Sequence, residues 1–141
     1  MALKVSKVDV WMTTIEDRSG GLAEKVGPLA EAGANFEFVF ARRTPENPGK
    51  GLALIYPVKG AKVVKAAAGA GWEKSATIAG LRVEGANKAG VGAKMLKALS
   101  DAGISFRGLS AAAVGRNFVC YLALDSAADA SRAAAVLRRV G

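Results

Sequence analysis

The sequence has no histidine and a single cysteine, Cys120, among its 141 residues. Without histidine, the chain cannot form a Ser-His-Asp or Cys-His nucleophilic site, a histidine general base or a histidine-bearing zinc site. One cysteine cannot form an internal disulfide bond or hold zinc, and its place in an alternating apolar segment indicates a buried, unreactive thiol. Catalysis by carboxylates or lysine stays open in principle, but the sequence offers no acid–base pair and no nucleophile with an orienting partner. We therefore expect no catalytic residue, no metal site and no cofactor, and the protein is predicted not to be an enzyme.

Long apolar runs are also missing. No stretch approaches the roughly 20 apolar residues that span a bilayer, and the first residues lack the apolar segment of a signal peptide. These absences predict a soluble, cytoplasmic protein with no membrane partner. The content of 51% hydrophobic and 23% charged residues is that of a globular chain, and the length allows one ordinary domain or two very small ones.

The sequence does contain an internal repeat with an offset of 70 residues. The segment LAEAGANF, which begins at Leu29, aligns with LSDAGISF, which begins at Leu99, and the offset is about half of the chain. At the same offset, Gly20 aligns with Gly90. A repeat of this length indicates two copies of one structural unit. We predict one unit at residues 1–75 and a second at residues 76–141.

Each copy carries the same order of expected elements. Alternating β-branched and aromatic residues predict strands, and apolar residues at helical spacing predict helices. In the first copy, we expect strands at 8–15, 36–40 and 52–56, helices at 22–30 and 61–70, and a closing strand at 72–76. Gly33 lies where a left-handed helix C-cap belongs. The alternating Phe36, Phe38 and Phe40 are expected on the core face beneath the helices.

The second copy repeats this order without the closing strand. We expect strands at 77–84, 105–114 and 118–124, a helix from 91 that ends at Gly103, and a last helix at 127–140. The fold class is therefore predicted as α+β: two ferredoxin-like βαββαβ units in tandem, each an antiparallel sheet with helices on one face. The missing strand predicts an open sheet edge in the second unit, and open edges favour pairing, so a homodimer is expected.

The turn after the first strand of each copy is the candidate binding site. In Asp17–Gly21 and in Asn87–Val91, a side chain with a carbonyl oxygen lies three residues before a glycine that opens a helix. Unpaired backbone N–H groups at such a helix start can hold a carboxylate, and the Asp or Asn oxygen can accept a hydrogen bond from an ammonium group. The alternative is purely structural: these residue types favour helix starts, and Ser19 could be an N-cap.

With these loops in place, the chain resembles the tandem ACT-domain family over nearly its whole length. That family has βαββαβ units and an Asp or Asn, two residues and a Gly between the first strand and the first helix. The resemblance implies a regulatory protein that binds an amino acid or similar zwitterion at the interface of its two units and acts on a protein partner. The implied ligand-binding residues are Asp17, Ser19, Gly20, Gly21 and Leu22 in the first copy, and Asn87, Ala89, Gly90 and Val91 in the second.

Two other functions fit the sequence less well. The net charge of +8 would attract nucleic acid, and ferredoxin-like folds include RNA-binding modules. A solvated helix face better explains the basic residues, which are Lys59, Lys62, Lys65, Arg132, Arg138 and Arg139. The phenylalanines are better explained as core, so nucleic-acid binding is not favoured. In a third interpretation, the loops only begin helices and the chain is a structural interaction or dimerisation module.

Overall fold

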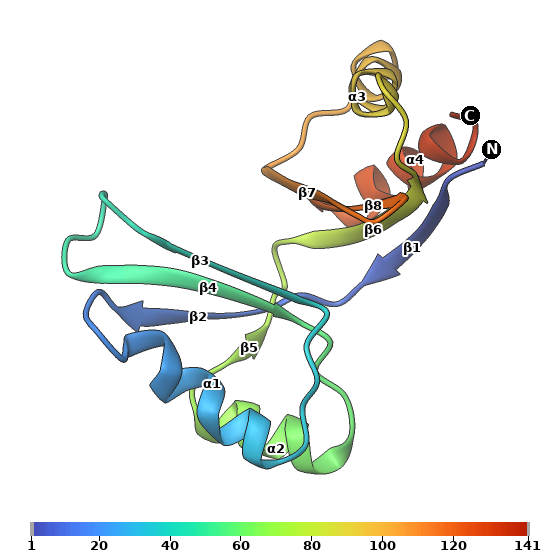
Figure 1. Ribbon diagram of the computed structural model, residues 1–141. Helices are drawn as coiled ribbons and strands as arrows, with labels where there is room; N and C mark the ends of the chain where they lie inside the picture. Colours follow the sequence, from blue (N-terminus) through green and yellow to red (C-terminus); the bar gives the residue numbers. More distant parts are fainter. Residues whose placement is uncertain (1, 141) are drawn as a thin grey trace. The chain divides into compact units, whose positions relative to one another are not determined.

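The computed structural model describes residues 2–140, which form two compact units (Figure 1). The central unit is Asp9–Ser75, and the split unit combines residues 2–8 with residues 76–140. The division therefore differs from the predicted boundary between residues 1–75 and 76–141, because the N-terminal residues belong to the sheet of the second unit. No helix within residues 2–140 has the length and apolar character needed to cross a membrane.

The central unit is a four-stranded antiparallel sheet with two helices. Its elements are β2 (Trp11–Glu16), α1 (Gly21–Glu31), β3 (Phe38–Arg43), β4 (Lys50–Tyr56), α2 (Ala61–Gly69) and β5 (Glu73–Lys74). The strand order is β3-β4-β2-β5. This is the ferredoxin-like arrangement, complete within one continuous segment, and its fourth strand is the short β5 that pairs with Trp11 and Met12.

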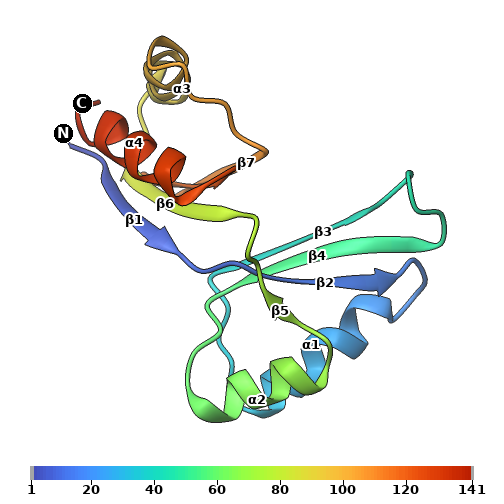
Figure 2. The same cartoon turned by 180° about the vertical axis from the view of Figure 1, so that it is seen from behind.

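The split unit has the same arrangement but takes its fourth strand from the start of the chain. Its elements are β1 (Lys4–Val8), β6 (Ala79–Ala86), α3 (Val91–Asp101), β7 (Gly108–Val114), β8 (Asn117–Leu124) and α4 (Ala127–Arg138). The order is β1-β6-β8-β7, so β1 lies beside β6 as β5 lies beside β2 (Figure 2). The prediction of a missing strand and an open edge beside β6 is therefore wrong.

The single strand predicted at residues 8–15 is two strands in different sheets. β1 ends at Val8 and β2 begins at Trp11. Val5 pairs with Val83 of β6, whereas Trp11 pairs with Ile55 of β4. The alternation of apolar residues continues through the crossing, so the pattern alone gives no sign that the chain changes sheets there.

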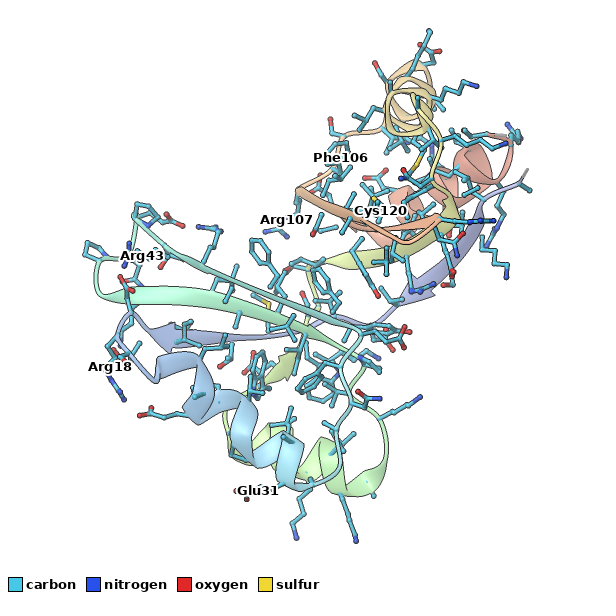
Figure 3. All side chains as sticks on the ribbon, in the orientation of Figure 1. Arg18, Glu31, Arg43, Phe106, Arg107 and Cys120 are labelled. Carbon is cyan, nitrogen blue, oxygen red and sulfur yellow. The ribbon has the colours of Figure 1, made fainter. Side chains whose placement is uncertain are left out.

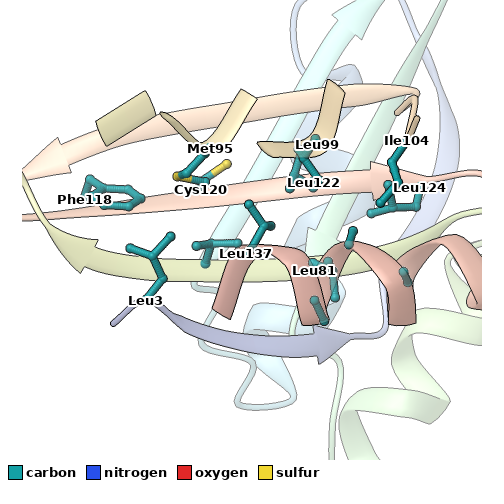
Figure 4. Packing of buried hydrophobic residues seen from close by; sticks show 14 residues of the cluster. Leu3, Leu81, Met95, Leu99, Ile104, Phe118, Cys120, Leu122, Leu124 and Leu137 are labelled. Atoms are coloured by element: carbon teal, nitrogen blue, oxygen red, sulfur yellow. The ribbon is translucent and has the colours of Figure 1, made fainter. Parts of the chain in front are cut away.

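Each unit has its own core between helices and sheet. In the central unit, the buried cluster comprises Leu29, Ala53, Ile55, Val63, Ala67 and Trp72. The split unit has the larger cluster, and Figure 4 shows Leu3 from the start of the chain packed among residues of β6, β8 and α4. Units of about 70 residues bury little surface, so the removal of one buried residue such as Leu3 should weaken this core.

The two aligned glycines end the first helix of each unit as predicted. Gly33 has φ 99° and Gly103 has φ 70°, the left-handed region that glycine adopts without strain. The N–H of Ala34 donates to the carbonyl of Leu29 at 2.9 Å, and the N–H of Ile104 donates to that of Leu99 at 3.0 Å. Both helices therefore close with the Schellman hydrogen bond, which satisfies a carbonyl at the helix end.

The phenylalanine stripe does not lie on the core face as predicted. Residues that are directly opposite in an antiparallel pair share a face of the sheet. Phe38 is opposite Tyr56 and Phe40 is opposite Leu54, whereas the core residue Ile55 is opposite Val39. Phe38 and Phe40 therefore lie on the face away from the helices. Only Phe36, which precedes β3, packs against the core, because the chain is not yet in the sheet at that position.

Candidate functional site

The candidate loop of the central unit connects β2 to α1 through four residues, Asp17 to Gly20. Gly20 is the N-cap of α1 and has a left-handed conformation, with φ 84° and ψ −6°. The N–H of Gly21 donates to the carbonyl of Arg18 at 3.0 Å, and the N–H of Glu24 donates to that of Gly20 at 3.0 Å. The loop is thus a tight turn that leads directly into the first helical hydrogen bond.

The loop of the split unit repeats this geometry. Gly90 is the N-cap of α3, with φ 86° and ψ −3°. The N–H of Val91 donates to the carbonyl of Lys88 at 3.1 Å, and the N–H of Lys94 donates to that of Gly90 at 3.0 Å. At an offset of 70 residues, the two loops therefore share the left-handed glycine N-cap and the same two turn hydrogen bonds.

Neither helix start is capped by a side chain. Ser19 is not the N-cap, so the capping interpretation of that residue is wrong. Within the described part of the chain, the backbone N–H groups of Leu22 and Ala23 in α1, and of Gly92 and Ala93 in α3, have no hydrogen-bond partner. These donors lie at the positive end of each helix dipole, where a negatively charged group is favoured.

Close packing against β2 explains why residue 21 is a glycine. A Cβ atom at this position would lie 2.0 Å from the carbonyl oxygen of Glu16, so no larger residue fits without moving the backbone. At the matching position, the split unit has Val91. The glycine at 21 therefore reflects how closely α1 approaches the end of β2, and this constraint is not shared by the second loop.

The two polar side chains have different surroundings. In the central unit, Oδ2 of Asp17 accepts a hydrogen bond from Nε of Arg43 at 2.8 Å, and its Oδ1 has no hydrogen bond to any of residues 2–140. Asn87 is exposed, and its side-chain amide has no hydrogen bond to any of residues 2–140. Its backbone N–H donates to the carbonyl of Arg116 at 2.8 Å. The Asn87 amide is thus available to a ligand, whereas only one of the two Asp17 carboxylate oxygens has no hydrogen bond to Arg43.

The first loop is also rich in ion pairs. Arg18 pairs with Glu24, and Lys50 pairs with Glu16. The hydrogen bond from Lys50 lowers the pKa of Glu16, and the hydrogen bond to Glu24 raises the pKa of Arg18. Figure 3 shows Arg18 and Arg43 near the ends of β2 and β3. The sequence analysis did not include Arg43 in the site, because its position opposite Gly51 depends on the register of β3 and β4.

A cavity of about 230 Å³ lies beside the second loop. Lys88, Ala89, Val91 and Lys94 line one part of it, and Leu3, Ala86 and Val140 line the rest. Ala89 and Val91 belong to the predicted site, whereas the two lysines do not. The structure therefore places two cations next to the predicted residues of this loop.

Solved structures share this architecture. Protein BT0572 from Bacteroides thetaiotaomicron is 19% identical with a TM-score of 0.75, over 92% of this chain and 87% of that one. The regulatory subunit of aspartate kinase from Thermus thermophilus is 17% identical with a TM-score of 0.66, over 99% of this chain and 97% of that one.

The chain has the fold of aspartate kinase regulatory subunits. This confirms the predicted fold, two ACT-like units in tandem. In the aspartate kinase of Clostridium acetobutylicum, described as an allosteric enzyme, the matching part covers 98% of this chain but 33% of the enzyme, with 17% identity and a TM-score of 0.62. No family model matches the sequence, and no curated protein matches it.

Proposed function

We propose that this chain is a regulatory module whose two loops bind an amino acid or a similar small zwitterion. The observation that carries the proposal is the pair of helix starts without a side-chain cap, each with a left-handed glycine as its N-cap, at Gly20 and Gly90. The N–H groups of these first turns can donate hydrogen bonds to a carboxylate. The fold shared with the regulatory subunits of aspartate kinases supports the same function.

In each loop, the proposed contacts divide between backbone and side chain. The carboxylate of the ligand accepts hydrogen bonds from first-turn N–H groups, those of Leu22 in α1 and of Gly92 in α3. The ammonium group donates to the free Oδ of Asp17 in one loop and to the side-chain oxygen of Asn87 in the other. Ser19, Gly20, Ala89 and Gly90 shape the turns that hold these groups in position.

The regulated partner is proposed to be an enzyme. A ligand that binds one conformation of the module better than another shifts the population toward that conformation. The partner then senses the surface that is favoured by the ligand. This mechanism requires no catalytic group in the chain itself.

The test is thermal unfolding of the protein with each of the common amino acids. A ligand at about a hundred times its dissociation constant adds roughly 2.7 kcal/mol of stability, and a shift of several degrees is expected. The double variant Asp17→Ala/Asn87→Ala should lose the shift. Glu31→Ala/Asn35→Ala is the matched control, because both residues are exposed on the central unit away from the loop. Equal shifts in the two double variants would contradict the site.

Arg43 separates a binding role of Asp17 from a structural one. If Asp17 binds ligand, Arg43→Ala frees its second oxygen, and the affinity for the amino acid is unchanged or higher while Asp17→Ala abolishes it. If Asp17 only holds Arg43, both variants leave ligand affinity unchanged. Isothermal titration calorimetry of the two single variants distinguishes these outcomes.

We also propose that the chain self-associates through the edge strand β7. Its seven residues, GLSAAAV, contain no charge and no proline, the features that usually protect an exposed edge. Leu109 is 43% exposed and Val114 is 70% exposed. Sedimentation equilibrium should show a dimer that Val114→Lys weakens. A monomer across the micromolar range would contradict this part of the proposal.

A further inference from the structure

The positive charge of the protein is concentrated in the split unit. Residues 1–8 and 76–141 contain eleven lysine and arginine residues and four acidic residues, a net charge of +7. Residues 9–75 contain nine lysine and arginine residues and eight acidic residues, a net charge of +1. Most of the excess positive charge therefore belongs to the split unit, so anions are attracted to that unit rather than equally to the whole surface.

Ion pairs occupy all four acidic residues of the split unit. Arg82 pairs with Glu84, Lys97 with Asp101, Arg107 with Asp125, and Arg132 with Asp129. Seven cations remain that have no acidic partner within residues 2–140: Lys4, Lys7, Lys88, Lys94, Arg116, Arg138 and Arg139. All of them are exposed, although Lys7 donates a hydrogen bond to Ser131 and Arg138 donates one to the carbonyl of Val5.

The topology gathers six of these seven cations at one end of the unit. The last residues of β6 lie at this end, together with the first residues of β1 and α3. The turn between β7 and β8 and the last residues of α4 lie there too. Lys4 is opposite Glu84 near the end of β6. The carbonyl of Arg116 accepts from Asn87 at 2.8 Å, and Arg138 donates to the carbonyl of Val5 at 3.0 Å. Figures 1 and 2 show the start of β1 close to the finish of α4.

The acidic groups are mostly at the opposite end. Asp101 is the last residue of α3, and Asp125 and Asp129 flank the start of α4. Glu84 is the acidic residue near the cations, and its Oε2 lies 2.9 Å from Arg82. Charge separation along the unit therefore favours an anion at the end where Lys88 and Lys94 lie.

The cations surround a space that a small molecule can enter. The cavity of about 230 Å³ has Lys88 and Lys94 on its wall, and Leu3, Val91 and Val140 supply apolar surface. A ligand with a charged group and an organic body matches this lining. Proteins that bind single-stranded nucleic acid combine cations with exposed aromatic rings for stacking. At this end of the split unit, the aromatic residue is Phe118, which is only 6% exposed.

We propose that this cavity binds a small molecule that carries a phosphate group, with Lys88 and Lys94 as its phosphate ligands. Each ammonium group donates to phosphate oxygens in a charge-assisted hydrogen bond. The surrounding Lys4, Arg116, Arg138 and Arg139 raise the local concentration of the anion. Lys88, Ala89 and Val91 of the Asn87 loop line this cavity, but the phosphate site needs neither an ammonium group on the ligand nor the side chains of Asp17 and Asn87.

The test is calorimetric titration of the full chain with inorganic pyrophosphate at low and physiological salt. K88A/K94A should bind at least tenfold more weakly than the unsubstituted protein. K62A/K65A is the matched control, because both lysines are exposed on α2 and lack an acidic partner within residues 2–140. The control should bind within twofold of the unsubstituted protein. Circular dichroism establishes that both variants are folded.

Three results would overturn the proposal: no binding of pyrophosphate, an equal loss in the two double variants, or tighter binding of an oligodeoxythymidine than of pyrophosphate. Tighter binding of the oligodeoxythymidine would indicate that the cations at this end of the split unit bind nucleic acid. Asp17→Ala/Asn87→Ala should retain pyrophosphate binding. Failure of the amino-acid panel would therefore leave this proposal intact, and failure with pyrophosphate would leave the zwitterion proposal intact.

Discussion

The indole Nε1 of Trp72 donates a hydrogen bond to the backbone carbonyl of Lys25 at 2.8 Å. The contact joins the segment after α2 to the middle of α1, and two other bonds support it. Nζ of Lys25 donates to the carbonyl of Ala70 at 2.9 Å, and Oγ1 of Thr13 donates to that of Gly71 at 3.0 Å. Trp72 is 2% exposed. It is therefore both a packing residue and a link between the two helices of the central unit.

Trp72→Phe should destabilise the central unit by about 1–3 kcal/mol, because the part-buried hydrogen bond to the Lys25 carbonyl is lost and the smaller ring leaves a gap. Urea unfolding followed by far-UV circular dichroism measures the change. Trp11→Phe is the control, since Trp11 is only half-buried. An equal loss in the two variants would contradict the special role of the Trp72–Lys25 bond.

Two glycines of α1 should respond to alanine in opposite directions. Gly21→Ala forces a Cβ into the carbonyl of Glu16, and overpacking of this kind costs about 1–3 kcal/mol or more. Gly27 has no atom within 4 Å of a built Cβ, so Gly27→Ala should stabilise the helix by about 0.5–1 kcal/mol. Chemical unfolding of both variants provides the measurement. Stabilisation by Gly21→Ala would show that α1 can move away from β2.

The thiol of Cys120 should be inert in the folded protein. Burial raises the pKa of Cys120 from 9.0 to about 11. The unfolded chain therefore ionises this thiol first, and the free energy of unfolding should be unaffected below pH 9 and should fall between pH 9 and 11. Reaction with a disulfide reagent at pH 8 should be slow in buffer and fast in urea. Fast labelling of the native protein would contradict the buried position.

Deletion of residues 2–8 should destabilise the split unit alone. The deletion removes β1 from the edge of β6 and Leu3 from the core. Both tryptophans, Trp11 and Trp72, are in the central unit, and Cys120 is in the core of the split unit. We expect thiol labelling of Cys120 to accelerate at least tenfold, while the unfolding midpoint from tryptophan fluorescence stays unchanged. A fluorescence midpoint that falls with the acceleration of labelling would contradict this assignment.

The repeat made most of the fold predictable from sequence. Gly33 and Gly103 marked two helix ends correctly because their left-handed conformation is a local demand. The crossing after Val8 was not predictable, since it depends on pairing between residues about 75 positions apart. The sheet face of Phe38 and Phe40 was wrongly predicted for a related reason. Strand register determines which face a side chain lies on, and the irregular segment before Phe38 interrupts the alternation.

The candidate loops were predictable from their residue types, but their surroundings were not. Asp17, Gly20, Asn87 and Gly90 follow from the spacing in the sequence. Arg43 reaches Asp17 from another strand, and nothing near Asp17 in the sequence indicates it. Lys88 and Lys94 become part of a cavity only because both ends of the chain, at Leu3 and Val140, fold against the start of α3.

The position of β1 also affects how the protein emerges during synthesis. The ribosome produces Lys4–Val8 well before their partner strand β6, which begins at Ala79. The central unit is made whole in between and can fold as soon as it is released. During that interval, the N-terminal strand has no partner in its own sheet. Nascent chains are therefore most exposed to pairing with neighbouring chains before the second half of the protein is translated.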